Sequence, residues 1–357
     1  MASFKYIIFA LLLLAASCSS GKVSRVLIAK AEKGDIEAQY KLGKMYQYGD
    51  EVEQNYDKAL KWFKLAAEQG HVNAQFNLGV MYAKGDGIPT NWKEAAKWYT
   101  MAADKGFAKA QYNLGVIYRD GEGVPKNGEE AVKWFKLAAE KGYIYAQYNL
   151  GGMYAKGDGF PKNGKEAFKW YKLAAEKGFA PAQNNLGVLY ANGKGVPKNG
   201  KEAVKWYKLA AKKGDMKAHL NLAEMYQDGK GVPKNIKEAI KWYEMAAEKG
   251  DESAQYNLGI MYDNGEGIPK NSKEAVKWYK LAAEKGNMKA QYNLGVMYAK
   301  GNGVPKNYIE AYAWLSVAKA KGLSEGFDKF ERDNLKHMTS EDISKAQEKA
   351  AIYFEKF

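Results

Sequence analysis

The chain has 357 residues, of which 46% are hydrophobic, and its 55 basic and 41 acidic residues give a formal net charge of +14. This hydrophobic content excludes a disordered chain. The single cysteine excludes internal disulfides, so the fold must be stable through packing alone.

The first 17 residues are typical of a secretory signal segment. Lys5 precedes an apolar run from Tyr6 to Ala16, which is too short to span a bilayer comfortably. The small residues before Cys18 resemble a bacterial lipoprotein signal, which implies that Cys18 is lipidated and becomes the mature N-terminus. Ordinary secretory cleavage and a retained membrane anchor are the alternatives. All three place the rest of the chain outside the cytoplasm, after a polar tether at residues 18–26.

Residues 27–322 repeat with a constant step of 36 residues, in eight copies. One copy reads AQYNLGVIYRDGEGVPKNGEEAVKWFKLAAEKG, from Ala110 to Gly142. A small residue recurs every 36 residues, at Gly43, Gly79, Gly115, Gly151, Gly187, Ala223, Gly259 and Gly295. A tryptophan recurs at the same interval from Trp62 to Trp314. A fixed period of this length indicates a stacked repeat array.

Each copy predicts two helices separated by a glycine-rich break. In the first helix of the second copy, the apolar residues Ala74, Leu78, Met81 and Tyr82 have helical spacing. The loop that follows contains Gly85, Gly87 and Pro89, which end a helix.

The second helix opens with an asparagine followed three residues later by glutamate, as in Asn91 with Glu94. This pattern indicates an asparagine variant of the capping box, worth about 1 kcal/mol. The predicted inner face is Ala95, Trp98, Tyr99, Ala102 and Ala103, and Gly106 follows as the C-terminal stop.

The central glycine of the first helix costs about 1 kcal/mol relative to alanine. Because one copy accepts Ala223 at this position, the requirement is for small size rather than for positive φ. We therefore predict that another helix packs closely over this position through its tryptophan.

The end copies depart from the consensus, as capping units of a solenoid do. Glu51 and Glu53 replace a loop glycine and the proline in the first copy. Residues 323–357 are predicted to form a helical cap, with one helix that contains Phe327, Phe330, Leu335 and Met338. A last helix starts at a Thr339 and Asp342 capping pair, and its predicted inner face is Ile343, Ala346, Ala350 and Phe354.

The recurring AQYNLGVMY, Gly-x-Gly-x-Pro, Glu-Ala-x-Lys-Trp-Tyr and LAAEKG segments resemble the Sel-one-like repeat, a relative of the tetratricopeptide repeat. The resemblance implies an all-α, right-handed superhelical solenoid of antiparallel helix pairs that serves as an adaptor for protein partners. A cysteine-rich branch of the family is associated with β-lactam binding or hydrolysis, and this chain lacks those cysteines.

No set of residues predicts an enzyme, a cofactor or a metal site. Gly159–Lys165 and Gly195–Lys201 match Gly-x-x-x-x-Gly-Lys but lack the following serine or threonine that would bind magnesium. Ser316 and Lys319 fit the Ser-x-x-Lys pattern of serine β-lactamases, without Ser-Asp-Asn or Lys-Thr-Gly elsewhere. The three histidines share no metal-ligand spacing and are interpreted as surface or helix-end residues: His71, His219 and His337.

Two columns of residues on the first helices are candidates for a binding groove. The asparagine column is Asn77, Asn113, Asn149, Asn185, Asn221, Asn257 and Asn293, and the candidates from the aromatic column are Tyr112, Tyr148, Tyr256 and Tyr292. The asparagines could bind an extended peptide backbone or satisfy loop groups of a neighbouring copy. The aromatic residues could line the groove or belong to the core.

The lysine excess is spread over all copies, which argues against a nucleic-acid interface. Many lysines have glutamate at helical spacing, such as Glu130 with Lys133, and are interpreted as a solvated face together with Lys136 and Lys141. The sequence therefore predicts an extracytoplasmic, non-enzymatic scaffold that binds a protein or peptide and contacts the membrane only through its N-terminal lipid. A weak β-lactam-binding protein and a binder of an anionic envelope surface are the alternatives.

Overall fold

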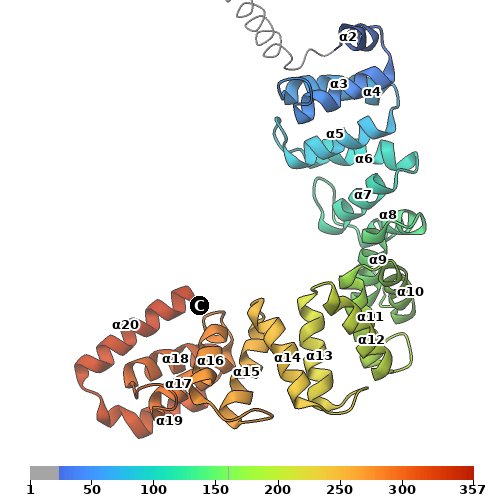
Figure 1. The fold of residues 1–357 in the computed structure, drawn as a ribbon. Helices are drawn as coiled ribbons and strands as arrows, with labels where there is room; N and C mark the ends of the chain where they lie inside the picture. Colours follow the sequence, from blue (N-terminus) through green and yellow to red (C-terminus); the bar gives the residue numbers. More distant parts are fainter. Residues whose placement is uncertain (1–23, 160) are drawn as a thin grey trace, which may run out of the picture. The chain divides into compact units, whose positions relative to one another are not determined.

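The computed structural model describes residues 24–159 and 161–357, and helices are the only regular elements in these ranges (Figure 1). The signal segment and Cys18 lie outside the described residues. The contacts divide the chain into two compact units, Met1–Lys177 and Gly178–Phe357. None of the described helices combines the length and the apolar character that a bilayer span requires.

Each repeat contributes two helices, nearly all of them 13 residues long. The first helices are α3 (Ile36–Tyr48), α5 (Val72–Lys84), α7 (Ala108–Asp120), α9 (Ile144–Lys156), α11 (Ala180–Asn192), α13 (Met216–Asp228), α15 (Glu252–Asn264) and α17 (Met288–Lys300). The second helices are α4 (Tyr56–Glu68), α6 (Trp92–Asp104), α8 (Gly128–Glu140), α10 (Gly164–Glu176), α12 (Gly200–Lys212), α14 (Ile236–Glu248), α16 (Ser272–Ala283) and α18 (Tyr308–Ala320).

Among the described residues, three helices and a short 3-10 turn flank the repeats. They are α2 (Arg25–Glu32), α19 (Ser324–Asn334), the turn Leu335–His337 and α20 (Ser340–Lys356). Within each unit, a helix packs most extensively against the other helix of its repeat and next against its neighbour in the adjoining repeat. The predicted all-α solenoid of antiparallel helix pairs is thus confirmed.

The second helices start at the predicted asparagines. Asn91 Oδ1 accepts a hydrogen bond from the backbone N–H of Glu94 at 3.0 Å. The prediction of a reciprocal capping box is wrong, because the Asn91 backbone N–H donates instead to the carbonyl of Tyr82 at 2.8 Å and so closes the loop onto α5. The Glu94 carboxylate is left for Lys97, whose Nζ lies 3.8 Å away.

The loop glycines are needed for their backbone conformation and for close approach. Gly87 has φ +71°, and a Cβ there would lie only 2.1 Å from Tyr56 Cβ in the preceding repeat. In the first copy Glu51 adopts the same left-handed conformation with φ 58°. The first copy therefore keeps the shape of the loop without the glycine.

A bulky side chain covers the central glycine, but it is not the tryptophan that we predicted. A Cβ on Gly79 would lie 2.5 Å from Tyr99 Cδ1, and one on Gly115 would lie 2.7 Å from Phe135 Cδ1. Successive residues of a helix point about 100° apart, so the residue after the tryptophan meets the glycine. Trp134 itself packs with the alanines of the preceding repeat's second helix.

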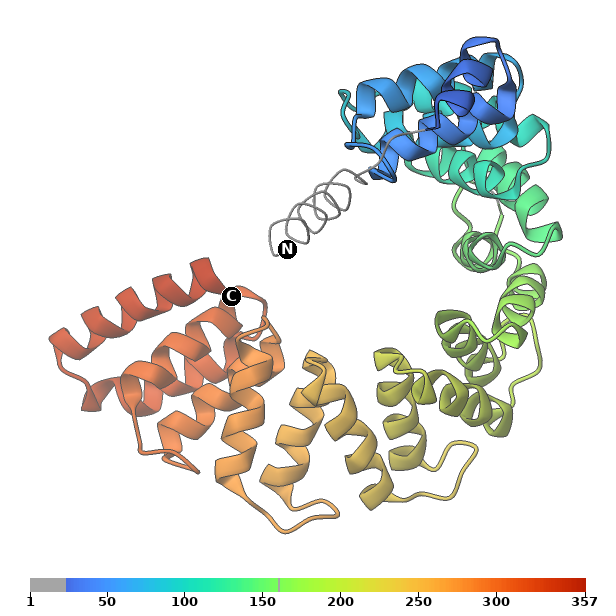
Figure 2. The same cartoon turned by 45° about the horizontal axis from the view of Figure 1, so that its top comes forward.

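Helix α20 packs along α18 at the end of the C-terminal unit (Figure 2). The predicted capping pair is present, because Thr339 Oγ1 accepts from the Asp342 N–H and the Asp342 carboxylate accepts from the Thr339 N–H. The predicted inner face is wrong at Phe354, which is 47% exposed. Tyr353 and Phe357 cover Trp314 instead, with ring centroids 4.3 and 5.6 Å away.

Candidate functional site

All seven asparagines of the column are half-buried on the first helices, and most of their amides bond to the preceding repeat. Asn149 Nδ2 donates to the hydroxyl of Tyr112, one repeat earlier, at 3.2 Å. The same step joins Asn77 to Tyr40 and Asn293 to Tyr256. The asparagine column is thus tied to the aromatic column of the preceding repeat.

Where the aromatic column lacks a hydroxyl, the asparagine uses a phenol from a second helix. Phe76 precedes Asn113 in this arrangement, and Asn113 bonds Tyr99. Leu220 precedes Asn257, and Asn257 bonds Tyr243. In the described residues, the partners identified for these asparagines in the preceding repeat are therefore phenol groups, with one exception: Asn221 bonds Asn184. They are not the loop groups that the sequence offered as an alternative.

The aromatic column is half-buried between the two helices of a repeat and the start of the next repeat. The Tyr112 ring lies 5.7 Å from Phe135 in its own repeat and 5.2 Å from Tyr143 in the next. Tyr148 and Tyr256 make the equivalent contacts with Tyr171 and Tyr279 at 5.8 and 6.0 Å.

Tyr292, the last member of the aromatic column, meets the C-terminal cap instead of another repeat. It borders a pocket of about 270 Å³ with Phe330 of α19. The columns therefore contribute both to packing between repeats and to the accessible surface. A ligand could reach their exposed edges.

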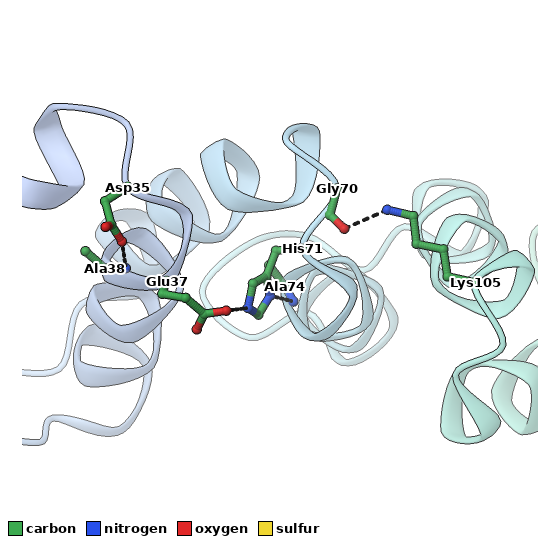
Figure 3. Close-up of polar contacts among 7 residues, drawn as sticks. All are labelled: Asp35, Glu37, Ala38, Gly70, His71, Ala74 and Lys105. Carbon is green, nitrogen blue, oxygen red and sulfur yellow. Dashed lines mark hydrogen bonds and ion pairs between the residues drawn. The ribbon is translucent and has the colours of Figure 1, made fainter.

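A second set of contacts between repeats involves lysines. Lys105 Nζ donates to the carbonyl oxygen of Gly70 at 2.6 Å, and Figure 3 shows this bond. The equivalent pairs are Lys141 with Gly106, Lys177 with Gly142, Lys213 with Gly178, Lys249 with Gly214, Lys285 with Gly250 and Lys321 with Gly286. Lys141 is exposed, as expected of a solvated face, and its ammonium group also binds the end of the preceding second helix.

The first repeats are also joined through His71, which caps α5. Its Nδ1 accepts from the Ala74 N–H at 3.1 Å, and its Nε2 lies 3.2 Å from Glu37 Oε1 in the preceding repeat (Figure 3). His337 lies at the end of the 3-10 turn, with its ring 6.0 Å from Tyr308.

His219 lies in the first turn of α13, as expected of a helix-end residue, but it is buried and is not a surface residue. His219 is 4% exposed and takes the place that a buried glutamine holds in other copies, such as Gln255. Its Nδ1 lies 2.7 Å from the Asp215 carbonyl oxygen, and burial lowers its pKa. Across the described residues, no histidine, cysteine, aspartate and glutamate side chains gather into a group that could hold a metal.

The structure does not bring Ser316 and Lys319 together as a nucleophile and base. Ser316 Oγ is buried and makes no hydrogen bond in the described part of the chain. Lys319 Nζ is bound to Asp328 Oδ1 at 3.0 Å. Gly159, the first residue of the Gly159–Lys165 motif, packs directly against the preceding repeat, since a Cβ there would lie 2.7 Å from Gly128 Cα.

Sequence reasoning missed a pocket of about 370 Å³ in the C-terminal unit. Helices α11, α12 and α13 contribute Asn192, Tyr207, Asn221 and Glu224 to its lining. A signal was present in the sequence, because Glu224 replaces a residue that is apolar or glycine in the other copies with a complete loop, such as Val188.

The chain matches known proteins over nearly all of its repeats. The model of the Sel1 repeat matches residues 36–71, 72–107, 108–143, 144–179, 180–215, 217–251, 252–287 and 289–323. A protective antigen of uropathogenic Escherichia coli with an SLR fold is similar at 37% identity and a TM-score of 0.79, over 93% of this chain and 72% of that one. A Sel1 repeat protein from Oxalobacter formigenes is similar at 31% identity and a TM-score of 0.75, over 90% and 92% of the two chains. No curated protein matches. The chain therefore belongs to the Sel1 repeat family, whose members generally serve as non-enzymatic scaffolds that bind protein partners.

Proposed function

We propose that this protein is an extracytoplasmic scaffold that binds an extended protein segment along the asparagine and aromatic columns of its first helices. One observation carries the proposal. The asparagine column is half-buried in all seven copies that contain it, and in five of these copies the preceding residue is aromatic, so a part-exposed amide recurs beside an aromatic ring along much of the array. An extended backbone offers donors and acceptors at regular intervals, and aromatic edges contribute contact area.

The test for the columns uses two variants that remove the same internal hydrogen bond. Asn149→Ala and Tyr112→Phe both break the bond between these two residues. Only Asn149→Ala also removes the amide from the surface. We expect Asn149→Ala to weaken partner capture from envelope extracts and Tyr112→Phe to retain it. Equal loss in both variants would mean that the asparagine acts only in packing.

We further propose that lipid on Cys18 anchors the scaffold and is its only contact with the membrane. The support is the apolar run followed by small residues before the single cysteine. Metabolic labelling with a fatty-acid analogue should mark the wild-type protein and not Cys18→Ser, which should also leave the membrane fraction. Labelling of the variant, or its retention in membranes, would contradict lipid anchoring.

The same extracts distinguish a protein partner from an anionic surface. Crosslinking followed by mass spectrometry should recover a protein joined to the first helices. Binding to anionic vesicles that falls steeply with rising salt, without a crosslinked protein, would instead support the surface alternative.

A further inference from the structure

The sixth repeat differs from its neighbours where α13 borders the 370 Å³ pocket. Val188 and Asn192 of α11 lie on one side of this pocket, and Asn221 and Glu224 of α13 line another. Tyr207 of α12 also reaches it. The pocket therefore combines apolar walls with several polar side chains.

Tyr207 has lost the partner that its counterparts keep. Tyr99, Tyr243 and Tyr279 each hydrogen-bond an asparagine of the following first helix, namely Asn113, Asn257 and Asn293. In this repeat the asparagine is Asn221, and its Nδ2 donates to Asn184 Oδ1 at 2.8 Å instead.

The Tyr207 side chain is nevertheless almost completely enclosed. It is 3% exposed, and its hydroxyl has no hydrogen-bond partner among the described residues. The hydroxyl borders the pocket and is not sealed from solvent, so a ligand in the pocket could supply the hydrogen bond that this tyrosine does not make within the chain.

Glu224 contributes a second unpaired group. Asp228 is bound to Lys230 at 2.7 Å, whereas Glu224 makes no ion pair in the described part of the chain. Burial, and then the charge of Asp228, raise the pKa of the Glu224 carboxyl group. Glu224 in turn helps burial to raise the pKa of Tyr207.

Lys230 offsets the acidic surroundings of Glu224 only in part, because burial and the Asp228 charge outweigh its effect and leave the pKa of the carboxyl group raised. Lys198 and Lys230 belong to the loops before α12 and after α13, and both are exposed. Lys230 is already paired with Asp228. Neither lysine forms an ion pair with Glu224 in the described part of the chain, so the carboxylate keeps its hydrogen-bonding capacity for a ligand.

We propose that this pocket binds a basic side chain, arginine above all, from the extended partner segment of the proposed function. The guanidinium group would donate to the Glu224 carboxylate and to the Tyr207 oxygen, since a guanidinium carries five donors in one plane. The alkyl stem would lie against Val188, Ala191 and Met225, which supply the apolar part of the lining.

The experiment uses the Met225 methyl group, which borders the pocket, as an NMR reporter in the full chain labelled with ¹³C-methyl methionine. Met261 holds the same place in the next repeat and is the internal control. We expect N-acetyl-argininamide to shift the Met225 signal saturably and to leave Met261 unchanged. Its neutral isostere, N-acetyl-citrullinamide, should shift neither.

Two variants assign the binding to the proposed groups. Glu224→Val introduces the residue type that Val188 represents, so it should fold, and it should weaken the argininamide affinity at least tenfold. Tyr207→Phe should weaken it severalfold, whereas Tyr243→Phe, which removes a phenol outside the pocket, should not. An unsaturable shift, an equal shift with citrullinamide or unchanged affinity in Glu224→Val would overturn the proposal.

The outcome is separable from that of the proposed function. If envelope partners crosslink equally to the wild type and to Glu224→Val, the scaffold stands and the arginine pocket fails. If argininamide binds the wild type but no protein partner is ever captured, the pocket stands and the scaffold function fails.

Discussion

The Lys105 ammonium group donates to the carbonyl oxygen of Gly70, and this bond joins the ends of two successive second helices. Gly70 follows α4 with φ +92°, at the end of a helix, where carbonyl groups lack helical partners. A cation is also favourable at this end of the helix dipole. The lysine therefore stabilises the preceding repeat rather than its own.

Replacing Lys105 by methionine should lower the free energy of unfolding by about 0.5–1.5 kcal/mol, the net contribution of one hydrogen bond. Urea unfolding measures the change. Lys84→Met is the control, because Lys84 is also exposed at the end of a helix but has no hydrogen bond to another repeat in the described chain. Equal effects of the two changes would show that only the helix dipole matters.

Two adjacent glycines of α9 separate crowding from helix propensity. A Cβ on Gly151 would lie 2.8 Å from Tyr171 Cδ1, whereas one on Gly152 would approach nothing closer than the Tyr171 hydroxyl at 3.4 Å. Gly152→Ala should therefore stabilise the protein by up to about 1 kcal/mol. Gly151→Ala should destabilise the protein by about 1 kcal/mol, because the cost of overpacking against Tyr171 exceeds the gain in helix propensity. Thermal unfolding that ranks the two variants the other way would contradict close packing of the Tyr171 ring.

The last helix should depend on Tyr353 and not on Phe354. Tyr353 covers Trp314, and its hydroxyl donates to Glu310 Oε2 at 3.0 Å. Tyr353→Ala should cost about 2–4 kcal/mol through lost ring packing, and Phe354→Ala less than about 0.5 kcal/mol. Tryptophan fluorescence should also report exposure of Trp314 only in Tyr353→Ala. A larger loss of stability in Phe354→Ala than in Tyr353→Ala would instead indicate that Phe354 belongs to the inner face of the helix.

His219 should make the sixth repeat sensitive to acid. Burial lowers its pKa below the ordinary value of 6.5, against the opposing effect of its hydrogen bond to Asp215, while the Lys249 charge adds to the lowering. The unfolded chain therefore binds more protons than the folded chain below about pH 6.5. Its free energy of unfolding should fall as the pH decreases through this window and be restored above it.

The matched variant for this pH effect is His219→Gln. Gln255 shows how glutamine fits in the next repeat, where its Nε2 donates to the Ala247 carbonyl at 3.0 Å. We expect the variant to lose less stability than the wild type between pH 7 and pH 5, in urea titrations at each pH. Parallel curves for the two proteins would exclude His219 as the source of the acid sensitivity.

The sequence could predict the helix pairs, their asparagine caps and their glycine breaks, because each depends on residues close together in the chain. It could also predict that the central glycine is crowded. It could not identify Tyr99 over Trp98 as the covering residue, because that depends on the rotation of one helix about its axis. The bonds from Lys105 to Gly70 and from Asn149 to Tyr112 were also hidden, since each joins residues a full repeat apart.

Those two kinds of bond have a further consequence for the number of copies. Each reaches 35 or 37 residues along the chain, only to the adjoining copy. Deleting residues 108–143 would place Lys177 opposite Gly106 and Asn149 opposite Phe76, both residue types that this chain already pairs or tolerates. Recombination within the gene can therefore add or remove whole copies. The number of repeats would change, while the contacts between adjoining repeats would stay of the same kind.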